Sequence, residues 1–160
     1  MATNTRITRI IAAVIGVIGA VMLVGGGVAW TMVSSQLADQ NMTVSPYSEE
    51  NPGKYAGEVV DGPITAWAQA DVIDTHALEA TGGKTYAEMD REDPVRPTAM
   101  NGALLRGALF TSVLAFGVSF MAGGVGLTLI LLAAGLFVAT KQPKVATAAA
   151  PVVEREYATA

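Results

Sequence analysis

The stretch Ile10–Val33, IIAAVIGVIGAVMLVGGGVAWTMV, decides the fold of this chain of 160 residues. It contains 24 residues and no charge. As a helix it would be about 36 Å long, enough to cross a hydrocarbon core of roughly 30 Å, where the backbone must satisfy its own hydrogen bonds. A secretory signal peptide is the rival interpretation, but the apolar run is long for one and no small-residue cleavage site follows it closely.

A second stretch, of 34 uncharged residues, lies between Arg106 and Lys141. As one helix it would be about 51 Å long, so part of it must tilt or project from the membrane. The chain is 51% apolar and 15% charged and has no cysteine, whereas globular proteins carry about 25% charge. We therefore expect an all-α membrane protein with transmembrane helices over 10–33 and 102–140. The composition argues against an ordinary soluble enzyme, a disordered chain, a nucleic-acid binder and a disulfide framework.

Basic residues near the ends of the two spans predict their orientation, because positively charged flanks stay in the cytoplasm. Four such residues flank the spans, at Arg6, Arg9, Lys141 and Lys144. We expect the N-terminus, 1–9, and a flexible tail, 141–160, in the cytoplasm beneath a plasma (inner) membrane. Residues 34–101 would then form an extracytoplasmic segment, with twelve acidic residues against four basic ones, a net charge of −8.

Two short helices are expected in the external segment. The first is predicted over 63–80, because Asp61 can cap it and Pro63 suits its first turn. The Gly82–Gly83 pair can end it, since glycine commonly follows the last helical turn. Nearly half of the segment looks irregular and should bury little apolar surface, so we expect contact with another protein to order it.

The second short helix is predicted over 85–91, where Thr85 and Glu88 form a capping box. Thr98 is the expected N-cap of a further helix that continues into the second span. Such an early start would absorb the excess length of that span and lift the charge of Arg106 out of the lipid.

Few residues in this chain could perform chemistry. His76 is the only histidine, and it shares a predicted helix with three carboxylates, at Asp71, Asp74 and Glu79. They could in principle hold a metal, but a surface histidine among solvated carboxylates is the favoured interpretation. Gly83-Lys84-Thr85 resembles the end of a phosphate-binding loop, yet Leu78 stands where that motif needs glycine. The uncharged stretches of the two spans, 10–33 and 107–140, contain no ionisable residue, so we expect no catalytic residue, no cofactor and no metal in this chain.

Small residues recur at helical spacing in both spans, and small side chains let helices in lipid approach closely. In the first span they are Ala12, Gly16, Gly19, Ala20, Gly26 and Gly27. In the second they are Ser112, Ala115, Ser119, Ala122, Gly123, Gly126 and Ala133. The two stripes could pack against each other as a hairpin. The alternative, which we favour, is that at least one stripe contacts a helix of a host protein.

Residues from Gly62 to Val118 also resemble a known family, most specifically in Thr81-Gly82-Gly83-Lys84-Thr85-Tyr86-Ala87-Glu88. Further matching positions include Trp67, Ala70-Asp71-Val72-Ile73, His76, Asp93-Pro94, Arg96, Thr98-Ala99-Met100 and Leu105-Arg106. The chain resembles a group of small two-span actinobacterial membrane proteins that automatic naming often labels aromatic ring-opening dioxygenases. That label does not fit, because one histidine gives no conventional iron-ligand set.

Members of this group appear as accessory subunits of the respiratory supercomplex that joins a cytochrome bcc complex to an aa3 oxidase. The resemblance implies a non-catalytic subunit that braces the core, with membrane lipid, cytochrome b, cytochrome c and oxidase subunits as partners. External residues expected to contact a partner are Trp67, His76, Lys84, Tyr86 and Arg96. Two alternatives stay open: a free-standing envelope assembly factor or scaffold of another membrane machine, and a metal-dependent enzyme.

Overall fold

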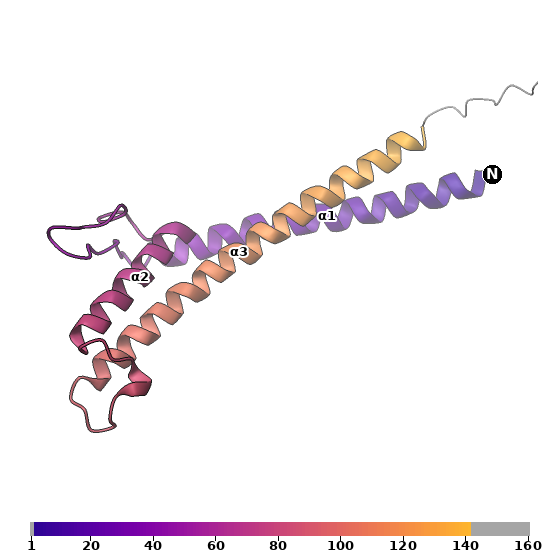
Figure 1. Ribbon diagram of the computed structural model, residues 1–160. Coiled ribbons are helices and arrows are strands. Elements are labelled where there is room, and N and C mark those ends of the chain that lie inside the picture. The colour runs from indigo at the N-terminus through magenta and orange to yellow at the C-terminus, as the bar shows by residue number, and fades with distance from the viewer. Residues whose placement is uncertain (1, 142–160) are drawn as a thin grey trace, which may run out of the picture.

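The computed structural model describes residues 2–141, which form a long two-helix hairpin with a smaller unit at one end (Figure 1). Its helices are α1 (Ala2–Ala38), α2 (Pro63–Ala80) and α3 (Arg96–Ala139), with one 3-10 turn, η1 (Tyr86–Glu88). The start of α1 lies beside the end of α3, so the two long helices are antiparallel. No strand occurs within 2–141, and the predicted all-α class is confirmed there. Most of the predicted tail lies outside the described residues.

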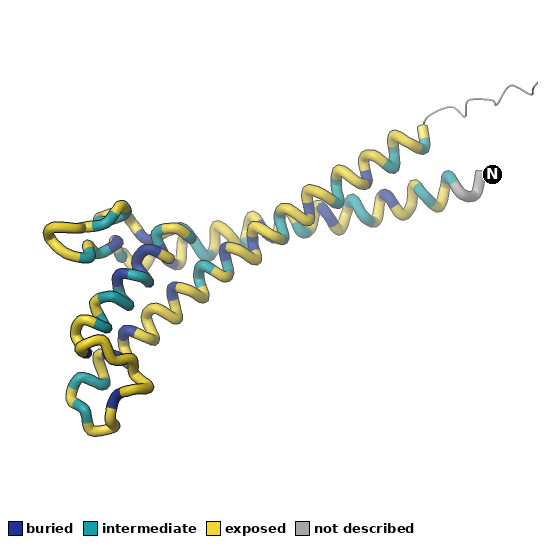
Figure 2. Tube along the Cα trace, viewed as in Figure 1, coloured by how far each residue is buried: buried dark blue, intermediate teal, exposed yellow. Residues whose placement is uncertain are grey.

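Both long helices are long and apolar enough to cross a membrane. α1 has 37 residues and α3 has 44, corresponding to about 55 Å and about 66 Å of helix. Only 11% of the most apolar 18-residue stretch of each helix is buried. Exposed residues accordingly cover most of both helices (Figure 2). Their apolar side chains therefore face mostly outward, unlike those of a helix in a soluble core.

Both long helices also extend beyond the predicted spans. α1 includes 10–33 and continues at either end, and α3 begins before residue 102 and ends at Ala139. The predicted early start of the second long helix is confirmed, because α3 passes through Arg106 without a break. Each helix exceeds a hydrocarbon core of roughly 30 Å, so each must project beyond it if it spans a membrane.

The N-terminus of α3 differs from the prediction in its capping residue. The helix begins at Arg96 with Val95 as its N-cap, and Pro97 occupies the first turn. The Asp93 side chain accepts a hydrogen bond from the Val95 backbone N–H at 2.9 Å. Thr98 therefore lies inside the helix, because Asp93 and Pro97 begin the helical turn before it.

Helix α2 has the predicted bounds but a different N-cap. Gly62, and not Asp61, precedes the helix, and its N–H donates to the Thr65 hydroxyl at 3.3 Å. At the other end the chain turns through Gly82 and Gly83, with φ of 66° and 82°. These left-handed values suit glycine, and they bring the Gly83 N–H to a carbonyl oxygen of the last helical turn at 2.7 Å.

The second short helix, predicted over 85–91, is not confirmed, because the structure has only a single 3-10 turn there, η1. The predicted capping box forms, because the Glu88 carboxylate accepts from the Thr85 N–H and hydroxyl, each at 2.8 Å. The next residue, Met89, is already extended, with φ −92° and ψ 140°. Its side chain is 6% exposed. The turn that begins at the capping box therefore ends at Glu88, and the next residue, Met89, is extended and buried.

The segment between α1 and α2 packs on its own chain. Val44 and Val60 are 3% and 0% exposed and belong to the apolar cluster that contains Ala66 of α2. The Val44 N–H donates to the Glu58 carbonyl at 2.8 Å, and the Val60 N–H donates to the Met42 carbonyl at 2.9 Å. We expected contact with another protein to order this segment. The structure shows that it also packs against α2 of its own chain.

Candidate functional site

Within residues 2–141, the contact between α1 and α3 is the most extensive contact between two helices. Six small residues at its centre are buried, Ala12, Gly19 and Gly26 in α1 and Ser119, Gly126 and Ala133 in α3. In each helix the three are seven residues apart. A seven-residue spacing is the coiled-coil period, which keeps the same side of a helix toward its partner.

The two backbones touch at this contact. A Cβ atom added to Gly19 would lie 2.7 Å from the Gly126 carbonyl oxygen, and one added to Gly26 would lie 2.7 Å from the Ser119 carbonyl oxygen. No side chain can replace hydrogen at either site unless the helices separate. In lipid, where apolar burial gives no driving force between helices, such close packing is what holds a pair together.

The structure separates the predicted small residues into two sets. The contact region includes Gly16 and Gly123, while Ser112, Ala115 and Ala122 are half-buried along the same side. Ala20 and Gly27 lie outside the contact and are exposed. Each follows a contact glycine by one residue and is therefore turned about 100° away from the partner helix. The stripe on α1 is thus narrower than expected, and it contacts α3 of the same chain.

A second row of small residues faces outward. Ala13, Ala20 and Gly27 of α1 are all exposed and repeat every seven residues. In α3, Gly117 and Gly124 are exposed at the same spacing. Nothing lies within 4 Å of a Cβ atom added to Gly27, Gly117 or Gly124. The hairpin therefore leaves small-residue surface that its own helices do not use.

Side-chain contacts join α1 to α3 toward both ends of the hairpin. Toward the end of the hairpin that carries α2, the Trp30 and Phe116 rings meet edge to face with centroids 4.7 Å apart, and Phe116 is 1% exposed. At the other end the Arg9 guanidinium donates to the Thr140 hydroxyl at 3.3 Å and to the Thr140 carbonyl at 3.4 Å. Arg9 thus places a cation at the negative end of the α3 dipole. The sequence suggested only its role in orientation.

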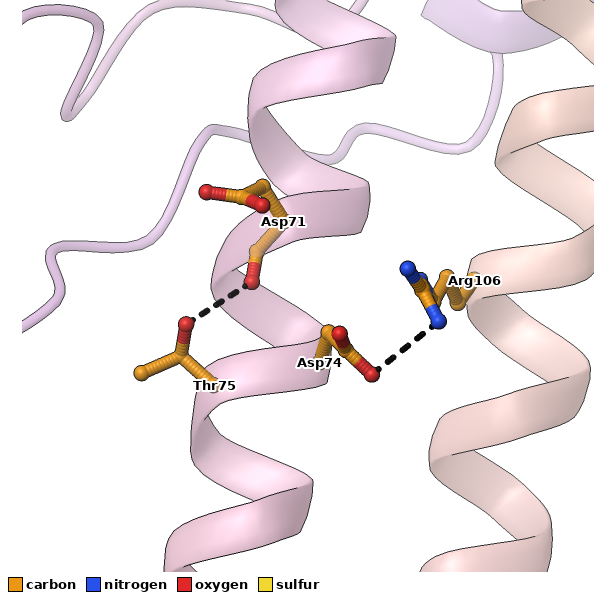
Figure 3. A network of polar contacts seen from close by, with 4 residues as sticks. All are labelled: Asp71, Asp74, Thr75 and Arg106. Atoms are coloured by element: carbon orange, nitrogen blue, oxygen red, sulfur yellow. Dashed lines mark hydrogen bonds and ion pairs between the residues drawn. The ribbon is translucent and has the colours of Figure 1, made fainter. Parts of the chain in front are cut away.

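Helix α2 shares an apolar cluster with α3 and is also joined to it by one close contact and one ion pair. A Cβ atom added to Gly102 would lie 2.6 Å from the Ala77 Cβ. One turn further along α3, the Arg106 guanidinium lies 3.3 Å from the Asp74 carboxylate (Figure 3). The charge of Arg106 is therefore paired with a carboxylate of α2, a partner that the sequence did not indicate.

Three of the predicted partner-contact residues gather where η1 meets the start of α3. The Arg96 guanidinium lies 4.1 Å from the centroid of the Tyr86 ring, a cation–π distance. Tyr86 and Lys84 also line a cavity of about 290 Å³, together with Asp74 and Arg106. The charged residues that line this cavity are Lys84, Arg106 and Asp74, and four of the other lining residues are alanines.

The other two, Trp67 and His76, lie against the segment before α2 instead. The His76 ring Nε2 is 3.1 Å from the Tyr47 carbonyl oxygen. The Tyr47 hydroxyl donates to the Asp71 carboxylate at 2.5 Å, and this bond, with burial and the adjacent charge, raises the pKa of the Tyr47 phenol. Trp67 is 50% exposed and lines a separate hollow with Tyr47. Within 2–141 no three His, Cys, Asp or Glu side chains lie where they could hold a metal ion.

Comparison with known proteins identifies no family. The chain matches no protein-family model, no curated protein and no solved structure. The resemblance carried by Thr81–Glu88 therefore stays a hypothesis, and function has to be inferred from the contacts and surfaces of the described residues.

Proposed function

We propose that this chain is a non-catalytic structural subunit of a larger assembly in the plasma (inner) membrane, with both termini in the cytoplasm. Two exposed apolar helices support the membrane location, because such surfaces are unfavourable in water over this length. The basic residues Arg6 and Arg9 before the first span and Lys141 after the second support the orientation.

The outward row of small residues is the observation that favours a docking role. Helices in lipid associate where small side chains allow backbones to approach, and Ala20 and Gly27 offer such a surface on α1. The hairpin is closed by a different set of residues, including Gly19 and Gly26. A host helix can therefore bind the outward row without opening the hairpin.

The proposed host is the cytochrome bcc–aa3 respiratory supercomplex, with cytochrome b, cytochrome c and oxidase subunits as neighbours. This choice rests on the resemblance of Thr81–Glu88 to accessory subunits of that complex. The residues Lys84, Tyr86 and Arg96, which lie together at one end of the structure, are the proposed contacts with an external partner. The chain would brace the assembly and carry none of its electrons.

Purification of a tagged chain from native membranes in mild detergent tests the proposal. A structural subunit of the supercomplex should be recovered at a fixed ratio with haem proteins. An untagged strain processed in parallel is the control for haem proteins that bind the resin. An assembly factor would be recovered at far less than one copy per finished complex. Recovery without any haem protein would reject the respiratory host.

A further inference from the structure

The first half of α2 lies at the level where the apolar part of α1 ends. Gln69 of α2 lines one cavity of about 490 Å³ together with Gln36 of α1 and Ser112 of α3. Gln36 is three residues beyond Val33, the end of the apolar stretch, or about 5 Å further along the helix. The polar headgroup layer of a bilayer occupies this depth, immediately outside the hydrocarbon core.

Two large apolar side chains of α2 are exposed at this depth. Ile64 is 59% exposed and Trp67 is 50% exposed, and their spacing of three places them on one side of the helix. The long helices also expose apolar side chains, among them Met32 of α1 and Phe110 and Leu114 of α3. The residues next to these three in the sequence, Val33, Leu109 and Val113, pack in or against the apolar cluster that contains Ala66 of α2. The start of α2 therefore lies at a level where both long helices still expose apolar side chains.

We propose that Ile64 and Trp67 rest in the headgroup layer of the bilayer, so that the first two turns of α2 bind phospholipid. The proposal depends on the membrane location of the hairpin. Tryptophan favours this layer because its ring is apolar while its N–H needs a polar partner. Within 2–141 the Trp67 ring makes no hydrogen bond, so its N–H is free for water or a lipid oxygen.

This contact would fix the angle of α2 to the membrane plane. Helix α2 is already joined to α3 through Asp74 and Arg106 and close packing at Gly102. An anchor at Trp67 would add a second point, so that the external unit is held by the lipid surface at one end and by α3 at the other. Lys84 and Tyr86 would then be presented at a fixed position beyond the lipid.

Fluorescence of single-tryptophan variants tests the contact, because Trp30 and Trp67 are the only tryptophans. The full-length Trp30→Phe variant, which keeps Trp67, is reconstituted into phosphatidylcholine nanodiscs with bromine near either the glycerol end or the methyl end of the acyl chains. We expect stronger loss of Trp67 emission with the shallow bromine than with the deep one. The Trp67→Phe variant, which keeps Trp30 within the span, reports insertion of the hairpin.

The outcomes separate this contact from the membrane location itself. Quenching of Trp30 by brominated lipid without quenching of Trp67 would reject the lipid contact and leave the spans in place. Absence of quenching for both residues would reject both. Quenching of Trp67 by aqueous acrylamide but not by either lipid would assign its ring to water and also reject the contact.

Spin labelling provides a second readout that leaves both tryptophans unchanged. The chain has no cysteine, so Ile64→Cys and Ala80→Cys each carry one nitroxide, at opposite ends of α2. We expect relaxation of the label at 64 by oxygen, which concentrates in lipid, to exceed its relaxation by a water-soluble nickel chelate. The label at 80 should show the reverse order. Equal preference for the nickel chelate at both positions would overturn the proposal.

Discussion

Gly19 and Gly126 meet across the hairpin so closely that a Cβ atom on Gly19 would lie 2.7 Å from the Gly126 carbonyl oxygen. The reverse substitution meets the same obstacle, because a Cβ atom on Gly126 would lie 2.6 Å from the Gly19 carbonyl oxygen. In both cases the obstructing atom belongs to the backbone, which cannot rotate aside as a side chain does. The contact therefore requires glycine on both helices.

The first prediction is that Gly19→Leu or Gly126→Leu separates α1 from α3. Overpacking of a close contact usually costs about 1–3 kcal/mol, and a backbone obstacle should place the cost at or above the upper end. The change can be measured as the denaturation midpoint in detergent, followed by the near-ultraviolet circular dichroism of Trp30 beside Phe116. Gly117→Leu is the matched control, since its added side chain enters open space. Equal stability of the Gly19 and Gly117 variants would contradict the close contact.

The second prediction compares the ion pair and the close contact between α2 and α3. Asp74→Asn should cost less than about 1 kcal/mol, because both side chains of the pair are more than a third exposed, Asp74 at 34% and Arg106 at 44%. Gly102→Val should cost about 1–3 kcal/mol or more, since its Cβ would lie 2.6 Å from that of Ala77. Protease resistance of the part formed by α2 and η1 ranks the two variants, and a larger effect of Asp74→Asn would refute this ranking.

The two long helices could be predicted from the sequence, because each contains an uninterrupted apolar run long enough to cross a membrane. The bounds of α2 were also predictable, since Pro63 and Gly82 mark its ends. The seven-residue spacing of the buried small residues in the hairpin could not be predicted from the sequence. Ala20 follows Gly19 directly, and only the relative positions of both helices distinguish the contact residue from its exposed neighbour.

Side-chain contacts between segments far apart in the sequence could not be predicted either. Asp74 and Arg106 belong to different helices, and Arg9 and Thr140 are 131 residues apart. Val44 lies in a polar run without apolar periodicity, so its burial could not be foreseen. The candidate partner-contact residues were chosen from a resemblance to a family, which carries no spatial information about which of them lie together.

The third prediction concerns the pH dependence of the turn η1. Hydrogen bonds from the Thr85 N–H and hydroxyl lower the pKa of the Glu88 carboxyl. A carboxyl whose pKa is lower in the folded protein stabilises the turn above its unfolded pKa, and this contribution is lost as pH falls through the folded value. Amide exchange at Thr85, corrected for intrinsic rates, should show loss of protection on acidification.

The matched variant for this effect is Glu88→Gln. Glutamine can still accept from the Thr85 N–H as the third residue of a capping box, but it does not titrate in this range. Protection of the Thr85 amide should therefore be weaker than in the native chain at neutral pH and should change little on acidification. An unchanged acid transition in the glutamine variant would show that another group controls the turn.

The fourth prediction tests the outward row of small residues as the host-binding surface. Ala20→Leu and Gly27→Leu should each lower co-purification with the host at least tenfold, because a leucine prevents close approach of a second helix and about 1.4 kcal/mol suffices for that factor. Hairpin stability should be unchanged, since both positions are exposed within the chain. Gly25→Leu, at an exposed position about 140° around the helix from Ala20, is the matched control for added bulk toward lipid. If both leucine variants were recovered with the host as well as Gly25→Leu, the outward row would be lipid-facing surface, and the docking role proposed for α1 would have to be abandoned.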